Sequence, residues 1–148
     1  TIDGINFTLT AIADRIDRAE DGRLHIYDYK TGTTPTPDQQ RVFDKQLYLM
    51  AAIAEHGGFE EIDPAPVASA AFIGIGGKYK EQIAPFDDEP LGGAWEKFKD
   101  LIVSYQSYEQ GYSARRALFS VKDFSDYDQL SRFGEWGLSD VPTPEDLT

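Results

Sequence analysis

The stretch Leu24-His25-Ile26-Tyr27-Asp28-Tyr29-Lys30 decides the fold, because its apolar residues recur at every second position as in a β-strand. Side chains two apart in a strand project to the same face, so Asp28 and Lys30 stand in line with Leu24 and Ile26. An acid and an amine thus share one edge of the expected core. A lone Asp-x-Lys pair is usually a surface ion pair worth roughly 0 to 1 kcal/mol, so the preceding segment decides its meaning.

The preceding segment is expected to form a hairpin with this strand. Glu20-Asp21-Gly22 is a tight-turn signal, since glycine accepts a positive φ. A loop of these three residues puts Asp14 opposite Asp28, whereas a two-residue loop would pair Arg15 with Asp28 and bring Asp17 to that face. We favour the first register and keep Asp17 as the alternative, because the first one gathers the apolar residues on one face: Ile12, Ile16, Leu24 and Ile26.

Two carboxylates and a lysine at the tip of a hairpin are the groups that metal-dependent phosphodiester hydrolysis requires. Mg²⁺ prefers one or two carboxylates, with water and substrate phosphate oxygens completing its octahedral shell. The cation polarises the phosphate and lowers the pKa of a bound water, and an ammonium group can offset the charge of the transition state. The residues therefore predict a divalent-metal site between Asp14 and Asp28, with Lys30 beside it.

Four motifs of the chain together resemble the PD-(D/E)XK nucleases of the RecB-like branch. Among these they are most similar to the C-terminal nuclease domains of AddB-type subunits, which belong to helicase-nucleases that process double-strand DNA breaks. The resemblance covers nearly the whole chain and rests on Ala11-x-x-Asp14-Arg15-Ile16-Asp17, Asp28-Tyr29-Lys30-Thr31-Gly32, Lys45-Gln46-Leu47, and Asp126-Tyr127-Asp128-Gln129-Leu130 with Gly134-Glu135-Trp136.

The resemblance implies an α/β fold, in which a mixed central sheet is flanked by helices around a restriction-endonuclease-like core. It implies an Mg²⁺- or Mn²⁺-dependent deoxyribonuclease, an exonuclease, acting in double-strand break repair. Asp14 and Asp28 would hold the metal with the backbone carbonyl of Tyr29, Lys30 would position the water, and Gln46 would support the site. The implied partners are DNA, the partner subunit of the helicase-nuclease, and the rest of the parent chain.

Two features depart from the family pattern. Relatives carry an acidic or His residue on a helix upstream of the first acid, but here only thirteen residues precede Asp14. We therefore expect a fragment without that first helix, and the isolated fragment need not be active. Relatives also carry Gln-x-x-x-Tyr on the following helix, whereas Met50 stands four residues after Gln46.

The charge of the chain weakens the case for strong DNA binding by this domain alone. Fourteen Lys and Arg residues against 26 Asp and Glu residues give a net charge of −12, whereas DNA affinity depends on cations that meet phosphates. The candidate DNA contacts are Lys45, Arg115 and Arg116. The alternative function is a non-catalytic, nuclease-like scaffold that docks a partner subunit, for which an acidic surface is equally suitable.

Composition excludes several other classes of site. The chain has no cysteine, which rules out disulfides, thiolate zinc sites, a cysteine nucleophile and a cysteine-held iron–sulfur cluster. No apolar run approaches the length of a membrane span and no signal peptide is present, so we expect a cytoplasmic protein without membrane contacts.

The remaining elements follow from periodicity and turn signals. Thr36 with Gln39 forms a capping box, and Gly57-Gly58 ends the helix that it starts. We expect strands over residues 5–19, 24–30, 67–75 and 78–84, helices over 37–56 and 92–111, and a short helix over 124–136. Residues 1–140 are expected to form the nuclease-like domain, and 141–148 a disordered tail.

Overall fold

The computed structural model describes residues 6–77, 80–107, 110–111, 129–130, 132, 135–136 and 139–141. Contacts between residues divide the chain into two units, Thr1–Val103 and Ser104–Thr148. The first unit contains every strand of the described chain. Its elements are β1 Arg15–Arg18, β2 Leu24–Lys30, α1 Pro37–Val42, α2 Gln46–Glu55, β3 Val67–Gly74, β4 Lys80–Ile83 and α3 Leu91–Ser104. The last residue of α3, Ser104, is the first residue of the second unit.

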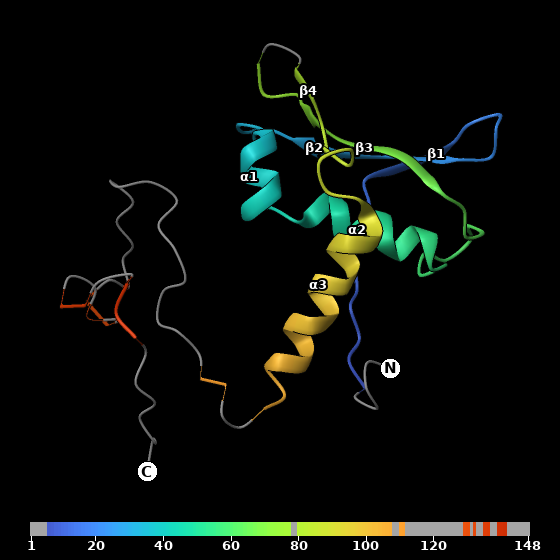
Figure 1. Ribbon diagram of the computed structural model, residues 1–148. Helices are drawn as coiled ribbons and strands as arrows, with labels where there is room; N and C mark the ends of the chain where they lie inside the picture. The colour runs from blue at the N-terminus through green and yellow to red at the C-terminus, as the bar shows by residue number, and fades with distance from the viewer. Residues whose placement is uncertain are drawn as a thin grey trace. The chain divides into compact units, whose positions relative to one another are not determined.

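The four strands form one mixed sheet in the order β1-β2-β3-β4 (Figure 1). Strands β1 and β2 are antiparallel, β2 and β3 are parallel, and β3 and β4 are antiparallel. The parallel pair requires a crossover between β2 and β3, and α1 and α2 provide it. The expected α/β architecture, a mixed sheet with flanking helices, is confirmed.

The hairpin between β1 and β2 has the register that the three-residue loop predicts. Ile16 pairs with Ile26 and Arg18 with Leu24, while Gly22 in the turn has a φ of 84°. The expected strand over 5–19 is nevertheless too long, because β1 has four residues and described residues 6–14 lie in no strand. Ile12 is 91% exposed, so its expected place in the core was wrong.

The segment before β1 leaves the sheet because its apolar side chains find partners elsewhere. The Phe7 ring lies edge-on to Phe98 of α3, with ring centroids 5.9 Å apart. Ala11 and Ala13 pack against the buried core. These contacts remove apolar surface from water without extending the ladder of an edge strand.

The core lies between α2 and the face of the sheet to which the even-numbered residues of β2 point. Leu24, Ile26 and Phe72 are each at most 1% exposed, and α2 contacts both β2 and β3. The helix contributes a nearly continuous run of buried residues: Leu47, Tyr48, Met50, Ala51, Ala52, Ile53 and Ala54. This packing fixes the helix against β2, which carries the acid–amine motif, and against its neighbour β3.

The helix expected over 37–56 is two helices. The Thr36 capping box forms as predicted, with Gln39 N–H donating to Thr36 Oγ1 at 3.3 Å and Thr36 N–H to Gln39 Oε1 at 2.8 Å. The N–H groups of Phe43 and Asp44 then both donate to the Gln39 carbonyl at 2.8 Å, which ends α1. The prediction of one helix was therefore wrong, and Gln46 begins α2 instead of lying in mid-helix.

The later elements agree in type with the expectations. Strands β3 and β4 occupy the ranges expected for a buried strand and its polar return, and α3 ends at Ser104 instead of residue 111. Arg115, Arg116 and most of the helix expected over 124–136 lie outside the described residues, as does the expected tail except for Val141. None of the described helices has the length and apolarity that crossing a membrane requires.

Candidate active site

Asp28, Lys30 and Gln46 form a closed ring of polar contacts where β2 ends and α2 begins. Gln46 Nε2 donates to Asp28 Oδ1 at 2.6 Å, and Lys30 Nζ donates to Gln46 Oε1 at 2.9 Å. Lys30 Nζ also lies 2.7 Å from Asp28 Oδ2. The break between α1 and α2 makes this ring possible, since Asp44 Oδ1 accepts from the Gln46 N–H at 3.2 Å and fixes the start of the helix.

The Asp28 carboxylate is buried, so it depends on its ion-pair and hydrogen-bond partners in place of water. Asp28 is 5% exposed, whereas the side chain of Lys30 is 30% exposed. Lys30 Nζ lies 4.9 Å from the centre of the Phe72 ring. Phe72 of β3 is the residue that stands opposite Asp28 in the register of β2 and β3. Burying a carboxylate costs free energy unless it is paired and hydrogen-bonded, and Lys30 and Gln46 provide an ion pair and a hydrogen bond for Asp28.

Asp14 is held against the same end of β2. Its Oδ2 accepts a hydrogen bond from the Tyr29 N–H at 2.8 Å, which brings its carboxylate beside the peptide bond that follows Asp28. Unlike Asp28, Asp14 is exposed. The pair thus consists of one buried and one exposed carboxylate, both near the backbone of Tyr29.

Asp17, the alternative ligand, is not brought to this point. It pairs with His25 in the hairpin register and accepts two hydrogen bonds from the Arg15 guanidinium, at 2.8 and 2.6 Å. The hydrogen bonds from Arg15 hold the pKa of Asp17 below its usual range. The register therefore favours Asp14 as the companion of Asp28.

The donor set fits a hard divalent cation. Asp28 Oδ2 is buried and accepts no hydrogen bond, since the approach of Lys30 Nζ has the distance of an ion pair without the angle of a hydrogen bond. The described residues hold no cluster of three or more His, Cys, Asp or Glu side chains suited to a metal. A cation here would therefore depend on Asp14, Asp28 and nearby backbone, with water and substrate completing its shell, as Mg²⁺ does.

Lys45, a candidate DNA contact, is engaged in an internal network. Its ammonium binds Glu89 and lies 4.6 Å from the centre of the Tyr48 ring. Lys97 binds the other Glu89 oxygen at 2.8 Å. Burial opposes ionisation of Glu89, but the hydrogen bonds from Lys45 and Lys97 outweigh it and lower its pKa. A role of Lys45 in DNA binding remains a prediction.

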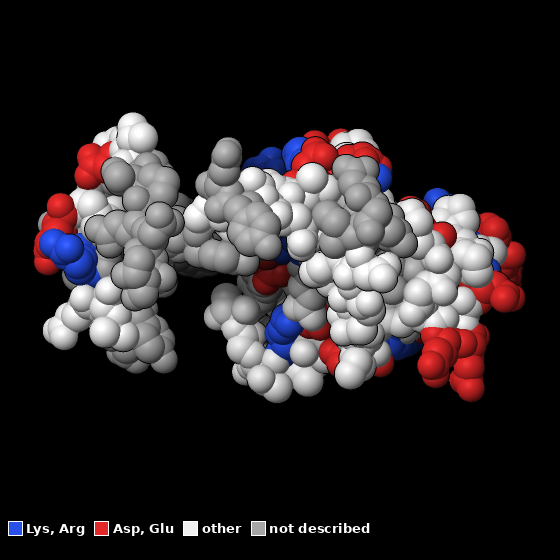
Figure 2. Space-filling view, turned by 90° about the horizontal axis from the view of Figure 1, so that it is seen from below, with Lys and Arg blue, Asp and Glu red and all other residues white. Residues whose placement is uncertain are grey.

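The visible surface charge agrees with the acidic composition. In Figure 2 acidic side chains form several patches on a described surface that is mostly uncharged, and Lys and Arg occur there as separate patches without a continuous basic stripe. Electrostatics alone therefore gives a nucleic-acid strand no extended track across the described part of this face.

Two residues of the site, Phe72 and Asp44, were not predicted from the sequence. Phe72 beneath Lys30 would have required the register between β2 and β3, which no local signal specifies. Asp44 was also missed, although Asp side chains commonly accept a hydrogen bond from the backbone N–H two residues on, as Asp44 does from Gln46. By contrast, Asp14, Asp28, Lys30 and Gln46 were all named from motifs and lie around one strand end.

The comparisons with known proteins agree with this geometry. The family model for the PD-(D/E)XK nuclease superfamily matches residues 1–132. No curated protein and no solved structure matches the chain significantly. The family match covers most of the chain and includes every residue of the ring, and the chain therefore belongs to the PD-(D/E)XK nuclease superfamily.

Proposed function

We propose that the chain is a divalent-metal-dependent deoxyribonuclease domain that hydrolyses phosphodiester bonds at the end of β2. Membership of a nuclease superfamily supports the reaction class. The single observation that carries the assignment of the site is the ring formed by Asp28, Lys30 and Gln46, with the Asp14 carboxylate beside it.

Each residue has a chemical role in this proposal. Asp14 and Asp28 hold an Mg²⁺ or Mn²⁺ ion, aided by the Tyr29 carbonyl group. When bound, such a cation polarises the phosphodiester and lowers the pKa of a water molecule. Lys30 orients the attacking water by donating a hydrogen bond and offsets the negative charge that develops on the phosphate oxygens. Gln46 acts as a positioning residue, since it contacts both Asp28 and Lys30.

We further propose that the domain works within an AddB-type helicase-nuclease, as an exonuclease in double-strand break repair. A net charge of −12 disfavours a tight grip on DNA by this chain alone, so other domains would deliver the strand. A partner subunit and the rest of the parent chain are the natural source of those domains.

The test compares Asp14→Asn with Asp17→Asn in the 148-residue chain. The two changes remove the same charge from neighbouring positions of one segment, but only Asp14 contacts the end of β2. Cleavage of labelled single-stranded and duplex DNA is followed with Mg²⁺ or Mn²⁺, and Mn²⁺ binding is followed separately by paramagnetic broadening of NMR signals. We expect Asp14→Asn and Asp28→Asn to weaken Mn²⁺ binding at least tenfold and to abolish cleavage.

Asp17→Asn is expected to bind Mn²⁺ and to cleave like the wild type. Equal effects of the two substitutions would contradict the assignment of the metal site. Wild-type chain that neither binds Mn²⁺ nor cleaves DNA, alone or with its helicase partner, would reject the enzyme and support the docking scaffold.

A further inference from the structure

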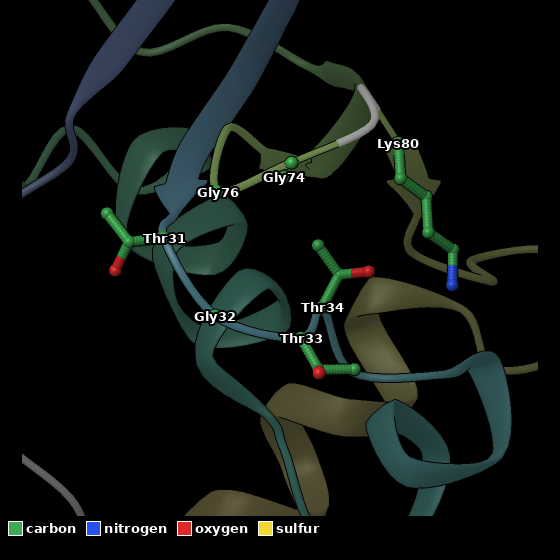
Figure 3. Close-up of a pocket in the computed structure, with 8 residues that line it drawn as sticks. Thr31, Gly32, Thr33, Thr34, Gly74, Gly76 and Lys80 are labelled. Atoms are coloured by element: carbon green, nitrogen blue, oxygen red, sulfur yellow. The ribbon is translucent and has the colours of Figure 1, made fainter.

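A cavity of about 400 Å³ opens directly beyond the Asp28-x-Lys30 motif (Figure 3). The loop that follows Lys30 forms one wall, and described residues at the end of β3 and the start of β4 form the other. The lining residues are Thr31, Gly32, Thr33, Thr34, Gly74, Gly76, Gly77 and Lys80. The cavity therefore begins one residue after the lysine of the candidate active site.

Thr34 is the unusual member of the lining. It is 2% exposed, and its hydroxyl oxygen is buried without a hydrogen-bond partner. Its methyl carbon faces Gly74, where an added Cβ would lie 3.4 Å away. Figure 3 shows the hydroxyl pointing toward the side of the cavity on which the Lys80 side chain extends. A buried hydroxyl without a partner costs free energy, which a ligand in this cavity would offset by accepting its hydrogen bond.

The two walls are fixed close together by their backbones. The Ile75 N–H donates to the Lys30 carbonyl at 2.9 Å. A Cβ at Gly76 would lie 1.7 Å from the Thr31 carbonyl oxygen, so no residue but glycine permits this approach. These contacts hold the cavity walls directly against the end of β2. A group bound in the cavity would therefore lie next to the proposed site of cleavage.

The chemistry of the lining selects an anion. Among the described residues of its lining Lys80 is the one that carries a charge, none is acidic, and no described residue forms an ion pair with Lys80. This is notable in a chain with 26 acidic residues. A hydroxyl donor, an ammonium group and short glycine-rich backbone together suit the oxygens of a phosphate group.

We propose that this cavity is a subsite for a backbone phosphodiester of the DNA strand, the one adjacent to the scissile phosphate. The Thr34 hydroxyl donates to a non-bridging oxygen and Lys80 balances the charge. The subsite orients the strand so that the next phosphate reaches Asp28 and Lys30. This inference rests on the proposed nuclease function, but phosphodiester binding is measurable without cleavage.

The test is an NMR titration of the full chain with the dinucleoside monophosphate TpT, in EDTA and without divalent metal. Thymidine, which has no phosphate, and inorganic phosphate are titrated in parallel. We expect saturable shifts of the Gly32, Thr33, Gly76 and Gly77 amides with TpT and none with thymidine. Thr34→Val and Lys80→Gln should each weaken this binding roughly five- to tenfold.

The controls separate loss of a ligand contact from loss of the fold. Thr34→Val keeps the shape of the side chain and removes an unpaired buried hydroxyl, so its melting temperature should equal or exceed that of the wild type. Lys99→Gln removes an equal charge from α3, where Lys99 pairs with Glu96, and should leave TpT binding unchanged. Lys80→Arg should restore most of the affinity that Lys80→Gln loses.

Three results would overturn the inference. The first is TpT binding without shifts at the cavity, and the second is equal binding by Thr34→Val, Lys80→Gln and the wild type. The third is binding of inorganic phosphate but not TpT, which would assign the cavity to a free or terminal phosphate. None of these bears on metal-dependent cleavage, so the proposed nuclease function can stand when the subsite fails. A chain that binds TpT at the cavity but does not cleave DNA would fail the nuclease function alone.

Discussion

Gln46 Nε2 lies 2.6 Å from Asp28 Oδ1, so the first residue of α2 is bonded directly to a buried acid of β2. Because the same amide accepts from Lys30 Nζ, one uncharged side chain fixes the distance between an acid and an amine of opposite charge. Lys30 Nζ already lies 2.7 Å from Asp28 Oδ2, and the amide contacts both partners of this ion pair, so it limits the orientations that the ammonium and the carboxylate can adopt. The site therefore connects the start of α2 to the end of β2, and the positions of Asp28 and Lys30 relative to Gln46 depend on where the helix begins.

Replacing Gln46 by alanine should impair this geometry without removing a charged group. We expect kcat to fall about tenfold to a hundredfold and Mn²⁺ affinity to fall in parallel, as for other residues that orient metal ligands. Gln46→Glu should be worse, because it places a second negative charge against Asp28. The measurements are cleavage kinetics with the DNA concentration varied, together with Mn²⁺ titration by NMR.

A purely structural role for Gln46 would give another pattern. Gln46→Ala would then lower the melting temperature while the folded fraction kept wild-type Mn²⁺ affinity and kcat. Leu49→Ala in the same helix is a suitable comparison, since Leu49 makes none of the polar contacts of the ring.

Divalent metal should stabilise the folded chain. A cation that binds the native state alone raises the free energy of unfolding by about 2.7 kcal/mol at a concentration one hundred times its Kd. Urea unfolding followed by circular dichroism, with and without saturating Mg²⁺, should reveal this gain in the wild type. Asp28→Asn should lose it, because the neutral amide is a poor ligand for a hard cation.

Asp28→Asn also changes stability in the absence of metal, and that effect must be separated. It leaves Lys30 without its counterion, although this side chain is 30% exposed and solvent offsets part of the loss. The informative quantity is therefore the difference that Mg²⁺ makes within each variant. An equal gain in the wild type and in Asp28→Asn would exclude Asp28 as a ligand.

Much of the candidate site was predictable because strand geometry is local. Alternation in residues 24–30 assigns Asp28 and Lys30 to one face, and the turn at Gly22 fixes the register of the hairpin. These two facts bring Asp14 to the end of β2 without knowledge of the rest of the fold. Gln46 depended on family resemblance, since nothing in its local sequence indicates that it faces a strand sixteen residues earlier.

The misjudged features depend on competition between local signals and tertiary contacts. The sequence of 37–56 favours helix throughout, yet two N–H groups converge on the Gln39 carbonyl and end α1. Residues 6–14 alternate like a strand, yet Phe7 packs on α3 instead. Neither outcome follows from periodicity, because the first depends on local hydrogen-bond geometry at Gln39 and the second on a ring of α3 far away in sequence.

Gly76 and Gly77 should respond very differently to alanine. A Cβ at Gly76 would lie 1.7 Å from the Thr31 carbonyl oxygen, whereas a Cβ at Gly77 would meet nothing within 4 Å. Because the clash involves backbone, it cannot be relieved by a side-chain rotation, and Gly76→Ala should destabilise the fold by about 1 to 3 kcal/mol. Gly77→Ala is the matched control and should change stability by less than about 0.5 kcal/mol.

The same pair also probes the link between the cavity and the active site. A shift of the Thr31 backbone would move Lys30, so the folded fraction of Gly76→Ala should lose cleavage activity as well. Chemical denaturation gives the stability, and cleavage per folded molecule gives the activity. Equal stabilities for the two variants would contradict the close approach of the two walls.

The network around Glu89 should make stability depend on pH. The pKa of Glu89 is lower in the folded state than its usual value, so its contribution is fully present above the pKa of an unfolded Glu and is lost as the pH falls through the folded value. Glu89→Gln should therefore destabilise the chain by about 1 to 2 kcal/mol at neutral pH. The difference in the free energy of unfolding between Glu89→Gln and the wild type should shrink steadily as the pH falls below the ordinary pKa of Glu, about 4.3.

Glu96→Gln is the control for Glu89→Gln. Glu96 is an exposed acid that pairs with Lys99 on α3, so its substitution should change the free energy of unfolding only slightly at every pH. Urea unfolding between neutral and acidic pH gives these differences. A Glu89→Gln penalty that stayed constant with pH would show that packing, and not the charge of Glu89, accounts for the contribution of this side chain to stability.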